Sequence, residues 1–557
     1  MRLRANEKSL YLSLPFEHRD TAKEIPGWQW NSTAKAWKYP LDRKVFELIV
    51  AKFPAVEIDP TVKEHLRAKE FSLQHYQWLK GTHFKADQSA NQFINGNFYR
   101  HQEMTFNWFR HMNVCADFSD AGAGKTLVQI ALIKERIKRN VLNKVLIICP
   151  ISIMEPVWKH DIEKFIFNDE FEYPVYILSD VKKAKQQLKH FALGIYIINY
   201  EKVWRVYDEL AKMKFDMIIL DESSKIKSHT AKQTKACIKL SENVPYKSIM
   251  TGTPAPNSYL ELWSQIRFLD PRILGHNFSS YRNLYFYPGG FENHEWFIKP
   301  NSKEHIHNLI QHISVAWKKK DCLDLPELTI QDITFDLPKE QMKLYKDMYE
   351  YMLTEIEGNL YTTNIVLTKL LRLSMITSGF IQDTGGENAR ALPKNEKLNV
   401  MEEIVEEIPS NKKVIIWAIF HHDIKIIYDM LIKKYGIGSA VKFYGQTSPK
   451  EKADNYELFK KSKNCRFFIA HPKSAGMGLN LSNASYSIFY SMNYSYESYA
   501  QSKERYNRTG QTENMTEYRL IAKGTIDQII FRALNNKQKI NDFIRDMGIN
   551  VKGETDE

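Results

Sequence analysis

The sequence predicts an α/β protein in which two parallel sheets with helical insertions follow a small α+β module. Short apolar segments rich in β-branched residues recur in both halves of the chain, with stretches of helical spacing between them. Such segments are typical of strands buried on both faces of a parallel sheet. They are 144–150, 194–200, 215–220 and 247–253 in the first half and 413–420, 442–445, 466–471 and 486–492 in the second.

The first sixty residues carry a different pattern. Leucine occupies alternate positions in 9–16, and a turn signal at 31–33 lies between Trp28, Trp30 and Trp37. Alternation and a polar turn between such runs predict a small module built on a hairpin. The tryptophans either form the core of this module or stack on exposed bases beside Lys35.

The expected organisation has four parts. Residues 1–65 form the small α+β module, with a helix from about Asp42, and residues 66–95 form a linker. The first sheet and a helical insertion occupy 96–325, and the second sheet occupies 326–557 with a helical insertion near 338–400. A chain of 557 residues is too long for one core, which agrees with this division.

Composition narrows the class of protein. Lys plus Arg exceeds Asp plus Glu by 78 − 66 = 12, which favours a polyanionic partner. The five cysteines form no CxxC pair, which argues against a disulfide scaffold, a zinc site or an iron–sulfur cluster. No apolar run reaches the ~18 residues of a membrane span, and the first residues lack a signal peptide's apolar stretch. We therefore expect a protein of the cytoplasm or nucleoid, or of the nucleus if the source is eukaryotic.

The segment "SDAGAGKT" (119–126) has the composition of a phosphate-binding loop. It follows the expected strand "NVCADF" and precedes an expected helix, as such a loop requires. Backbone N–H groups around Gly122 and Gly124 would surround the β-phosphate, Lys125 would reach the β and γ oxygens, and the Thr126 hydroxyl would bind Mg²⁺. The strict pattern has glycine where this chain has Ser119, so an ordinary turn remains the alternative.

Two adjacent acids, Asp221 and Glu222, end the apolar segment 215–220. Asp221 could hold the Mg²⁺ shell, and Glu222 could orient and polarise an attacking water molecule. The alternative is a solvated strand end. The acids come two predicted strands after the loop in the sequence. Because the carboxyl ends of parallel strands meet at one edge of a sheet, the sheet could bring the acids and the loop together.

The order of motifs resembles the Swi/Snf-type ATPases of helicase superfamily 2. The resemblance covers roughly residues 96–545 and implies that both sheets are RecA-like lobes. The segments that carry it are "YRHQ", "AGAGKT", "LIICPISIMEPVW", "INYEKV", "DESSKIKS", "TGTPAPNSYLELWSQIRFLDP", "KKKDCLDLPEL", "SAGMGLNLSNA", "QSKERYNRTGQ" and "TEYRLIAKGTIDQII".

This resemblance implies ATP and Mg²⁺ as cofactors and DNA as a partner bound without sequence readout. It implies that Gln102 contacts the edge of adenine and that Arg505 and Arg508 are the cations that reach the γ-phosphate. An i, i+3 spacing on a helix would place both arginines on one face. The alternative is that this face is simply exposed to solvent. The implied coupling residues are Thr251, Thr253 and Gln501, and the implied DNA contacts are Ser152, Asn199, Lys227, Gly478, Asn480 and Asn493.

Two positions depart from the family pattern. Ser224 stands where a histidine or glutamine usually links the ATP state to the coupling motif, and "SMNYS" (491–495) replaces a segment that contains Asn-Pro. These departures concern coupling more than fold.

The N-terminal module is similar to the HARP-type domain of annealing helicases through "IPGWQWNSTAKAWKYPL". We expect no histone substrate, because the chain lacks room for reader domains.

The predicted function is that of an ATP-dependent DNA translocase that tracks along duplex or branched DNA and remodels or re-anneals it. Two alternatives stay open. One is a strand-separating helicase on DNA or RNA, which requires a wedge element. The other is a nucleotide-gated DNA-binding module that hardly hydrolyses ATP.

Overall fold

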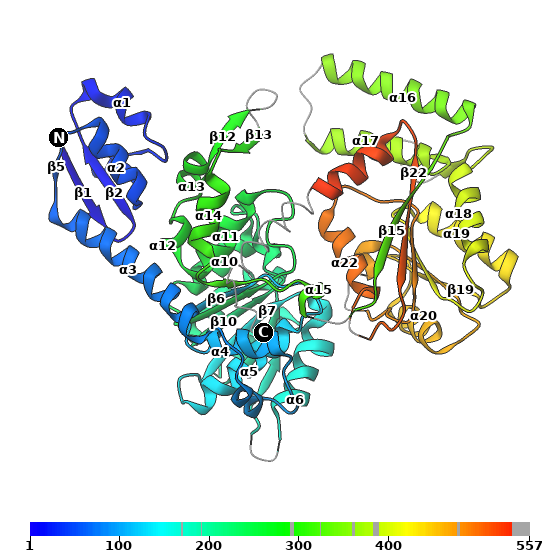
Figure 1. Cartoon of the computed structure of the whole chain (residues 1–557), viewed down its shortest axis with the longest axis horizontal. Helices are drawn as coiled ribbons and strands as arrows, with labels where there is room; N and C mark the ends of the chain where they lie inside the picture. Colours follow the sequence, from blue (N-terminus) through cyan, green and yellow to red (C-terminus); the bar gives the residue numbers. More distant parts are fainter. Residues whose placement is uncertain are drawn as a thin grey trace, which may run out of the picture. The chain divides into compact units, whose positions relative to one another are not determined.

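A computed structural model of the chain describes residues 1–168, 171–190, 192–289, 295–322, 325–358, 363–382, 389–475, 479–508 and 510–536. The chain divides after Cys322 into two compact units (Figure 1). Each unit has its own parallel sheet and its own hydrophobic core, which confirms the predicted fold class. Within the described residues, no helix combines the length and the apolarity that crossing a membrane requires.

The first unit contains a seven-stranded sheet in the order β14-β6-β11-β10-β7-β9-β8. Every pairing in this sheet is parallel. The carboxyl ends of its strands therefore lie along one edge. The strands are β6 (Val114–Asp117), β7 (Lys144–Cys149), β8 (Val175–Ile177), β9 (Gly194–Asn199), β10 (Met217–Asp221), β11 (Tyr246–Met250) and β14 (Ser314–Val315).

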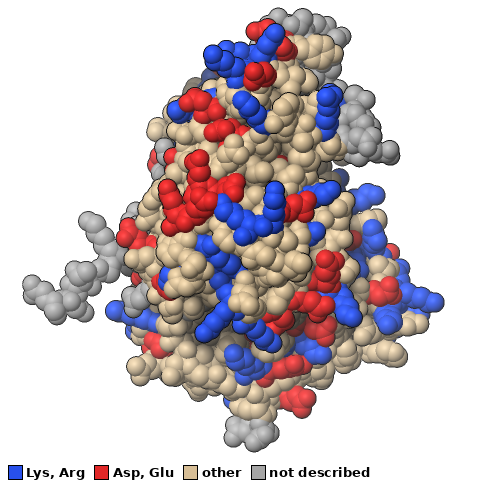
Figure 2. Space-filling model, turned by 90° about the vertical axis from the view of Figure 1, so that its right-hand side faces the viewer, with Lys and Arg blue, Asp and Glu red and all other residues tan. Residues whose placement is uncertain are grey.

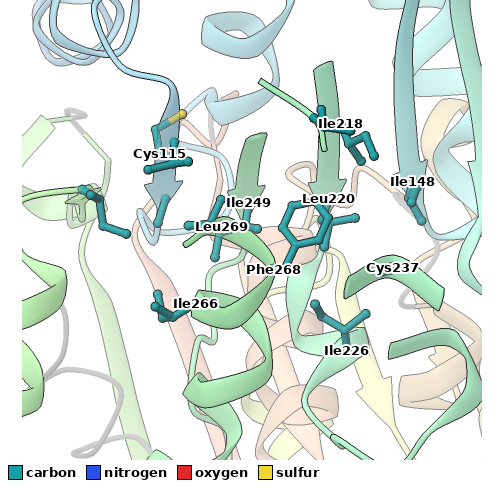
Figure 3. Close-up of a cluster of buried hydrophobic side chains, with 14 of the residues drawn as sticks. Cys115, Ile148, Ile218, Leu220, Ile226, Cys237, Ile249, Ile266, Phe268 and Leu269 are labelled. Carbon is teal, nitrogen blue, oxygen red and sulfur yellow. The ribbon is translucent and has the colours of Figure 1, made fainter. Parts of the chain in front are cut away.

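Helices cover this sheet and close its core. Figure 3 shows one part of that core, where Ile218 and Leu220 of β10 and Ile249 of β11 lie near Phe268 and Leu269. The helices are α4 (Arg100–Phe109), α5 (Lys125–Lys138), α6 (His160–Ile166), α7 (Val181–Leu188), α8 (Tyr200–Val203), α9 (Tyr207–Met213), α10 (Lys232–Ser241), α11 (Leu262–Leu269), α12 (Pro271–Leu274), α13 (Phe278–Tyr285), α14 (Ser302–Ile310) and α15 (Lys319–Cys322). A short hairpin, β12 (Phe286–Gly289) and β13 (Glu295–Ile298), follows α13.

The N-terminal module has a five-stranded sheet in the order β3-β4-β2-β1-β5. The predicted hairpin is β3–β4, in which Trp37 is 7% exposed and Trp30 is 53% exposed. Trp37 therefore belongs to the core, and Trp30 packs on it from the solvent side at 5.2 Å between ring centroids. The elements are β1 (Arg2–Asn6), β2 (Ser9–Ser13), α1 (Arg19–Lys23), β3 (Gln29–Asn31), β4 (Ala36–Pro40), α2 (Arg43–Lys52) and β5 (Glu57–Ile58).

The segment expected as a linker contains a long helix, α3 (Pro60–His83). Its first turns bury Val62 and Leu66 in the core of the module. Its last turns bury Tyr76 and Leu79 in the core of the parallel-sheet part, and Lys80 Nζ donates to two backbone carbonyls there. One helix thus contributes to both cores of the first unit.

The second unit has a six-stranded parallel sheet in the order β15-β22-β21-β18-β20-β19. The strands are β15 (Leu328–Phe335), β18 (Val414–Trp417), β19 (Ala440–Phe443), β20 (Phe467–Ala470), β21 (Tyr486–Phe489) and β22 (Met515–Ala522). The other elements are α16 (Lys339–Gly358), α17 (Thr363–Thr377), β16 (Phe380–Gln382), β17 (Ala389–Ala391), α18 (Glu396–Glu407), α19 (His421–Tyr435), α20 (Pro449–Lys461), α21 (Pro472–Ala475) and α22 (Tyr496–Tyr506).

A buried ion pair joins α18 to the segment after β22. Lys397 Nζ lies 2.7 Å from Asp527 Oδ2, and the two side chains are 1% and 8% exposed. Lys397→Met should lower the free energy of unfolding of this unit by about 3–5 kcal/mol, because it leaves a buried carboxylate without its cation. Trp417 is the one tryptophan after residue 322, so its ¹⁹F resonance in fluorotryptophan-labelled protein reports on this unit during urea titration.

The matched control is Lys412→Met. Lys412 pairs with Glu513 at a site where the side chains are 31% and 46% exposed, so its loss should cost at most about 1 kcal/mol. Equal costs for the two variants would show that burial does not govern the Lys397 pair.

A second buried carboxylate, Asp423 of α19, predicts a pH dependence. Its Oδ2 accepts hydrogen bonds from Ser491 and Ser378, but burial dominates and raises its pKa to about 7. Between about pH 4 and pH 7 the folded unit keeps a proton that the unfolded chain releases, so its stability should fall as the pH rises through that window. Asp423→Asn should flatten this slope in the same ¹⁹F titration, and an unchanged slope would assign the dependence to another group.

Candidate functional site

The loop after β6 has the backbone of a tight cradle. Gly122 and Gly124 adopt φ angles of 85° and 78°, in the left-handed region that glycine tolerates best. A Cβ atom on Gly124 would overlap the side-chain amide of Gln102, so a side chain at this position would displace that amide from the loop. Gly124 directly precedes α5, which places the backbone N–H groups of the loop at the start of that helix.

Lys125 is the first residue of α5, and its side chain turns back into the loop. Its Nζ donates to the carbonyls of Ser119 at 2.6 Å and Asp120 at 3.0 Å. Thr126 follows at the second position of the helix. The Lys125 ammonium and the Thr126 hydroxyl therefore both come from the first turn of α5, directly after the glycine loop.

Ser119, which departs from the strict glycine pattern, has a structural role. Its Oγ accepts a hydrogen bond from the backbone N–H of Trp317 at 3.0 Å, and its own N–H donates to Asp117. Asp120 adds two further bonds to the same segment, from its N–H to the Trp317 carbonyl and from the Lys319 N–H to its carboxylate. The serine thus fastens the loop to the chain that follows β14.

Gln102 lies against this loop, at the first turn of α4. Its Oε1 accepts from the Tyr99 N–H at 2.9 Å, and its Nε2 donates to the Ala123 carbonyl at 3.4 Å. His101 Nε2 also lies 2.8 Å from that carbonyl oxygen. The amide predicted to contact adenine is therefore placed beside the glycine loop, and its role in reading adenine stays a prediction.

Asp221 ends β10, two strands away from β6 in the sheet. Trp158 Nε1 donates to its Oδ2 at 2.8 Å, and the Tyr200 hydroxyl donates to its backbone carbonyl. Burial raises the pKa of this carboxyl, whereas the Trp158 bond and the nearby Lys125 ammonium favour its charged form. Asp221 and Lys125 are therefore close enough for the charge of one to act on the other.

Glu222 has a left-handed backbone, with φ 58° and ψ 55°, although it is not a glycine. Its Oε1 accepts from the Thr251 hydroxyl at 2.8 Å and from the Ser224 hydroxyl at 2.6 Å. Thr251 also receives the Thr253 N–H and donates its own N–H to the Asp117 carbonyl. The predicted coupling residues Thr251 and Thr253 thus connect Glu222 to the strand that leads into the loop.

Three contributing residues were missed by sequence reasoning. Trp158 and Tyr200 hold Asp221, and Gln265 accepts from the Ser223 hydroxyl and donates to the Pro254 carbonyl. Gln265 is a fully buried amide between the apolar residues Trp263 and Ile266 of α11, and a polar residue so close to apolar ones is the signal that could have identified it. Trp158 lies in a single π-helical turn, Met154–Lys159, a feature that sequence patterns do not reveal.

The predicted nucleic-acid contacts of the first unit follow other strands at the same edge. Ser152 lies in the turn after β7, and Lys227 follows the short helix after Glu222. Asn199 ends β9 but is 4% exposed, and its amide donates to Glu201. Its surroundings therefore make it the least accessible of the three.

Two candidate residues of the second unit lie outside the helices and strands, Asn480 before β21 and Asn493 before α22. Asn480 Oδ1 accepts from the Ser482 N–H, and Asn493 Oδ1 accepts from the Ser495 N–H. Gln501 lies within α22. Gly478 lies outside the described residues.

The helical spacing expected for Arg505 and Arg508 is wrong, because α22 ends at Tyr506. Arg505 is helical, whereas Arg508 lies in the turn beyond Asn507, where Nη1 donates to the Leu479 carbonyl at 3.3 Å. The turn leads to Gly510, whose φ of 97° continues away from a helical path. Among the described residues, Arg508 Nε is buried and has no hydrogen-bond partner, so the guanidinium keeps an unsatisfied donor there.

Fold and site together define the class of the protein. A glycine loop between a strand and a helix, an Asp-Glu pair at the same sheet edge and a second parallel α/β unit are the parts of a helicase-like protein. The comparisons with known proteins give the particular family.

The chain belongs to the SNF2-related family. Residues 99–383 match the SNF2-related domain, and residues 396–510 match the helicase conserved C-terminal domain. These matches confirm the resemblance to Swi/Snf-type proteins of helicase superfamily 2. Both begin after the N-terminal module, so its similarity to the HARP-type domain stays a prediction.

Two similar proteins are about one quarter identical to the chain over the aligned residues. A Mycoplasma pneumoniae protein named as an uncharacterized ATP-dependent helicase is 27% identical over 76% of this chain and 39% of its own length. Human DNA repair and recombination protein RAD54B is 24% identical over 75% of this chain and 50% of its own length. The chain therefore spans half or less of these relatives. The Sulfolobus solfataricus SWI2/SNF2 ATPase core in complex with dsDNA gives a TM-score of 0.39 at 26% identity, covering 81% of this chain and 94% of that one.

The glycine geometry predicts a specific defect. Gly124→Ala should distort the loop, because the new methyl group meets Gln102 Nε2 and the backbone must hold a positive φ at a cost of about 1–2 kcal/mol. Binding of a fluorescent ATP analogue should weaken by at least about tenfold. Gly438→Ala is the control, since Gly438 has φ 87° but no atom within 4 Å of an added Cβ. A loss of binding in the control as large as in Gly124→Ala would contradict the steric explanation.

Proposed function

We propose that the chain is an ATP-dependent DNA translocase that uses hydrolysis to track along duplex or branched DNA and to remodel or re-anneal it. The observation that carries the proposal is the hydrogen bond from Thr251 to Glu222 at 2.8 Å. It connects the acid expected to position the attacking water with the motif expected to couple hydrolysis to motion. Membership of the SNF2-related family supports the use of ATP.

The loop residues supply the binding part of the chemistry. Lys125 exchanges its bonds to loop carbonyls for the β and γ oxygens of ATP, and the backbone N–H groups around Gly122 and Gly124 hold the phosphates. Thr126 and Asp221 fit Mg²⁺, because a hydroxyl and a carboxylate are hard oxygen ligands and a nearby cation offsets the burial of Asp221. The metal would neutralise charge that develops on the transferred phosphoryl group.

Glu222 orients the water that attacks the γ-phosphate. Two hydroxyl donors fix one oxygen of its carboxylate, and the left-handed backbone fixes the direction from which the side chain emerges. A positioned carboxylate of this kind contributes by orientation and by accepting a proton. Arg505 and Arg508 remain proposed as the cations that stabilise the transferred group, and the unsatisfied Nε of Arg508 is a donor suited to that task.

DNA is proposed as the polymer along which the protein moves, because the chain has a formal net charge of +12 and a relative is named for DNA repair and recombination. Figure 2 shows that basic and acidic side chains are interspersed on the face it draws. Binding on that face would rely on local phosphate contacts rather than on one broad basic field. The residues proposed for these contacts are Ser152, Asn199, Lys227, Gly478, Asn480 and Asn493.

The ATP site is tested by two substitutions with a control. Glu222→Gln should lower the ATPase kcat by about 10²–10⁴-fold while the affinity for an ATP analogue is kept, because only water activation is lost. Lys125→Ala should weaken the affinity itself. Glu163→Gln, at a half-exposed position on α6, should change neither quantity. Unchanged turnover in Glu222→Gln would favour the nucleotide-gated binding module instead.

The DNA assignment is tested in the same assay with single-stranded, duplex and forked DNA and with RNA, beside triplex-displacement and fork-annealing assays. Stimulation by duplex DNA together with triplex displacement supports translocation. Separation of strands would support the helicase alternative, and stimulation by RNA alone would overturn the DNA assignment.

A further inference from the structure

Helix α3 buries one face and leaves another in solvent. Along the solvent face lie Phe71, which is 71% exposed, and Trp78, which is 59% exposed. Seven residues, about two helical turns, separate them, so the two rings lie on the same side of the helix about 10 Å apart. Exposed apolar side chains that gather on one face can mark an interaction site.

Further rings continue this face beyond the helix. His75 stacks on Trp78 with centroids 5.9 Å apart, and His83 meets the edge of Trp78 at 6.1 Å. His83 in turn stacks on His111 at 3.7 Å. His75, Trp78, His83 and His111 thus form a continuous row of rings from α3 to the turn just beyond α4, and Phe71 lies one helical turn before His75 on the same side of α3. We call these five residues the ring face.

The charged groups beside the ring face are mostly basic. Lys85 and Arg110 lie near His83, and Arg139 lies near His111. Glu135, the acid that pairs with both arginines at 3.3 Å, is only 1% exposed, so its carboxylate offers little negative surface. Of the nearby exposed acids, Glu70 is engaged by Arg43, and Asp87 caps the N–H of Ser89.

We propose that the ring face binds unpaired nucleotides. Bases would stack on Phe71 and Trp78, and the phosphates of the nucleotides beyond Trp78 would lie toward Lys85, Arg110 and Arg139. Base stacking on aromatic side chains beside cations is the usual mode by which proteins hold single strands without reading sequence. A protein partner is the less suitable occupant, because exposed rings bordered by cations match a polyanion better than an apolar surface. The inference rests on the proposed function for its DNA and adds the class of DNA, a strand with unpaired bases.

The test compares one double variant on two substrates. Phe71→Ala/Trp78→Ala should weaken binding of a ~15-nucleotide oligothymidylate by at least about tenfold, measured by fluorescence anisotropy, because each lost ring removes a stacking surface. Affinity for blunt duplex and the ATPase rate that blunt duplex stimulates should stay within about twofold of the wild type. The control is Phe16→Ala, which removes an aromatic ring that is 77% exposed on the N-terminal module and should change neither affinity.

A second variant separates stacking from structural damage. Trp78→Phe keeps a ring and should keep most of the single-strand affinity, which a merely structural role for Trp78 would not predict. Unchanged oligothymidylate binding by the double variant overturns the inference, and so does an equal loss on blunt duplex. Loss of self-association by the double variant, with oligothymidylate binding intact, would also overturn it in favour of a protein-docking face. Duplex-stimulated ATPase of the wild type, measured in the same preparation, tests the proposed function separately.

Discussion

The site depends on one constraint, which is that every strand of the first sheet runs in the same direction in the order β6, β11, β10. This order places Thr251, at the end of β11, between the glycine loop that follows β6 and the acids that end β10. A hydroxyl at that position can reach Glu222 while its backbone N–H bonds to the last residue of β6. The spatial link between the loop and the acid pair therefore follows from strand order, before any ligand is considered.

The surrounding structure holds Glu222 in a backbone conformation that a non-glycine residue rarely adopts. A left-handed backbone costs a non-glycine residue about 1–3 kcal/mol, and it persists only where the surroundings hold it. Tyr200 holds the carbonyl of the preceding residue, and the hydroxyls of Thr251 and Ser224 hold the Glu222 side chain. Ser224, which departs from the family pattern, therefore keeps a direct bond to the acid, although with a shorter side chain than histidine or glutamine.

The N-terminal module is attached to the first parallel sheet by a helix that belongs to both cores. Val62 and Leu66 are buried at one end of α3, and Tyr76 and Leu79 are buried at the other. Bending the connection would expose apolar surface or break the bonds of Lys80 to the carbonyls of Gln311 and Ser314. A displacement of the first sheet would therefore be transmitted to the module, and the ring face of α3 would move with it.

The sequence alone determined the parallel strands, the glycine loop, the adjacent acids and the family, because apolar periodicity and motif order are local properties of a chain. Ser119, Trp158, Gln265 and the turn that carries Arg508 were decided by tertiary structure. Their roles depend on backbone groups and side chains that are far apart in sequence, such as the bond from Trp317 to Ser119. The end of α22 before Arg508 was likewise missed, since residue spacing cannot tell a helix from the turn that follows it. Local pattern specifies which elements form, whereas long-range packing and the satisfaction of buried polar groups decide which side chains meet.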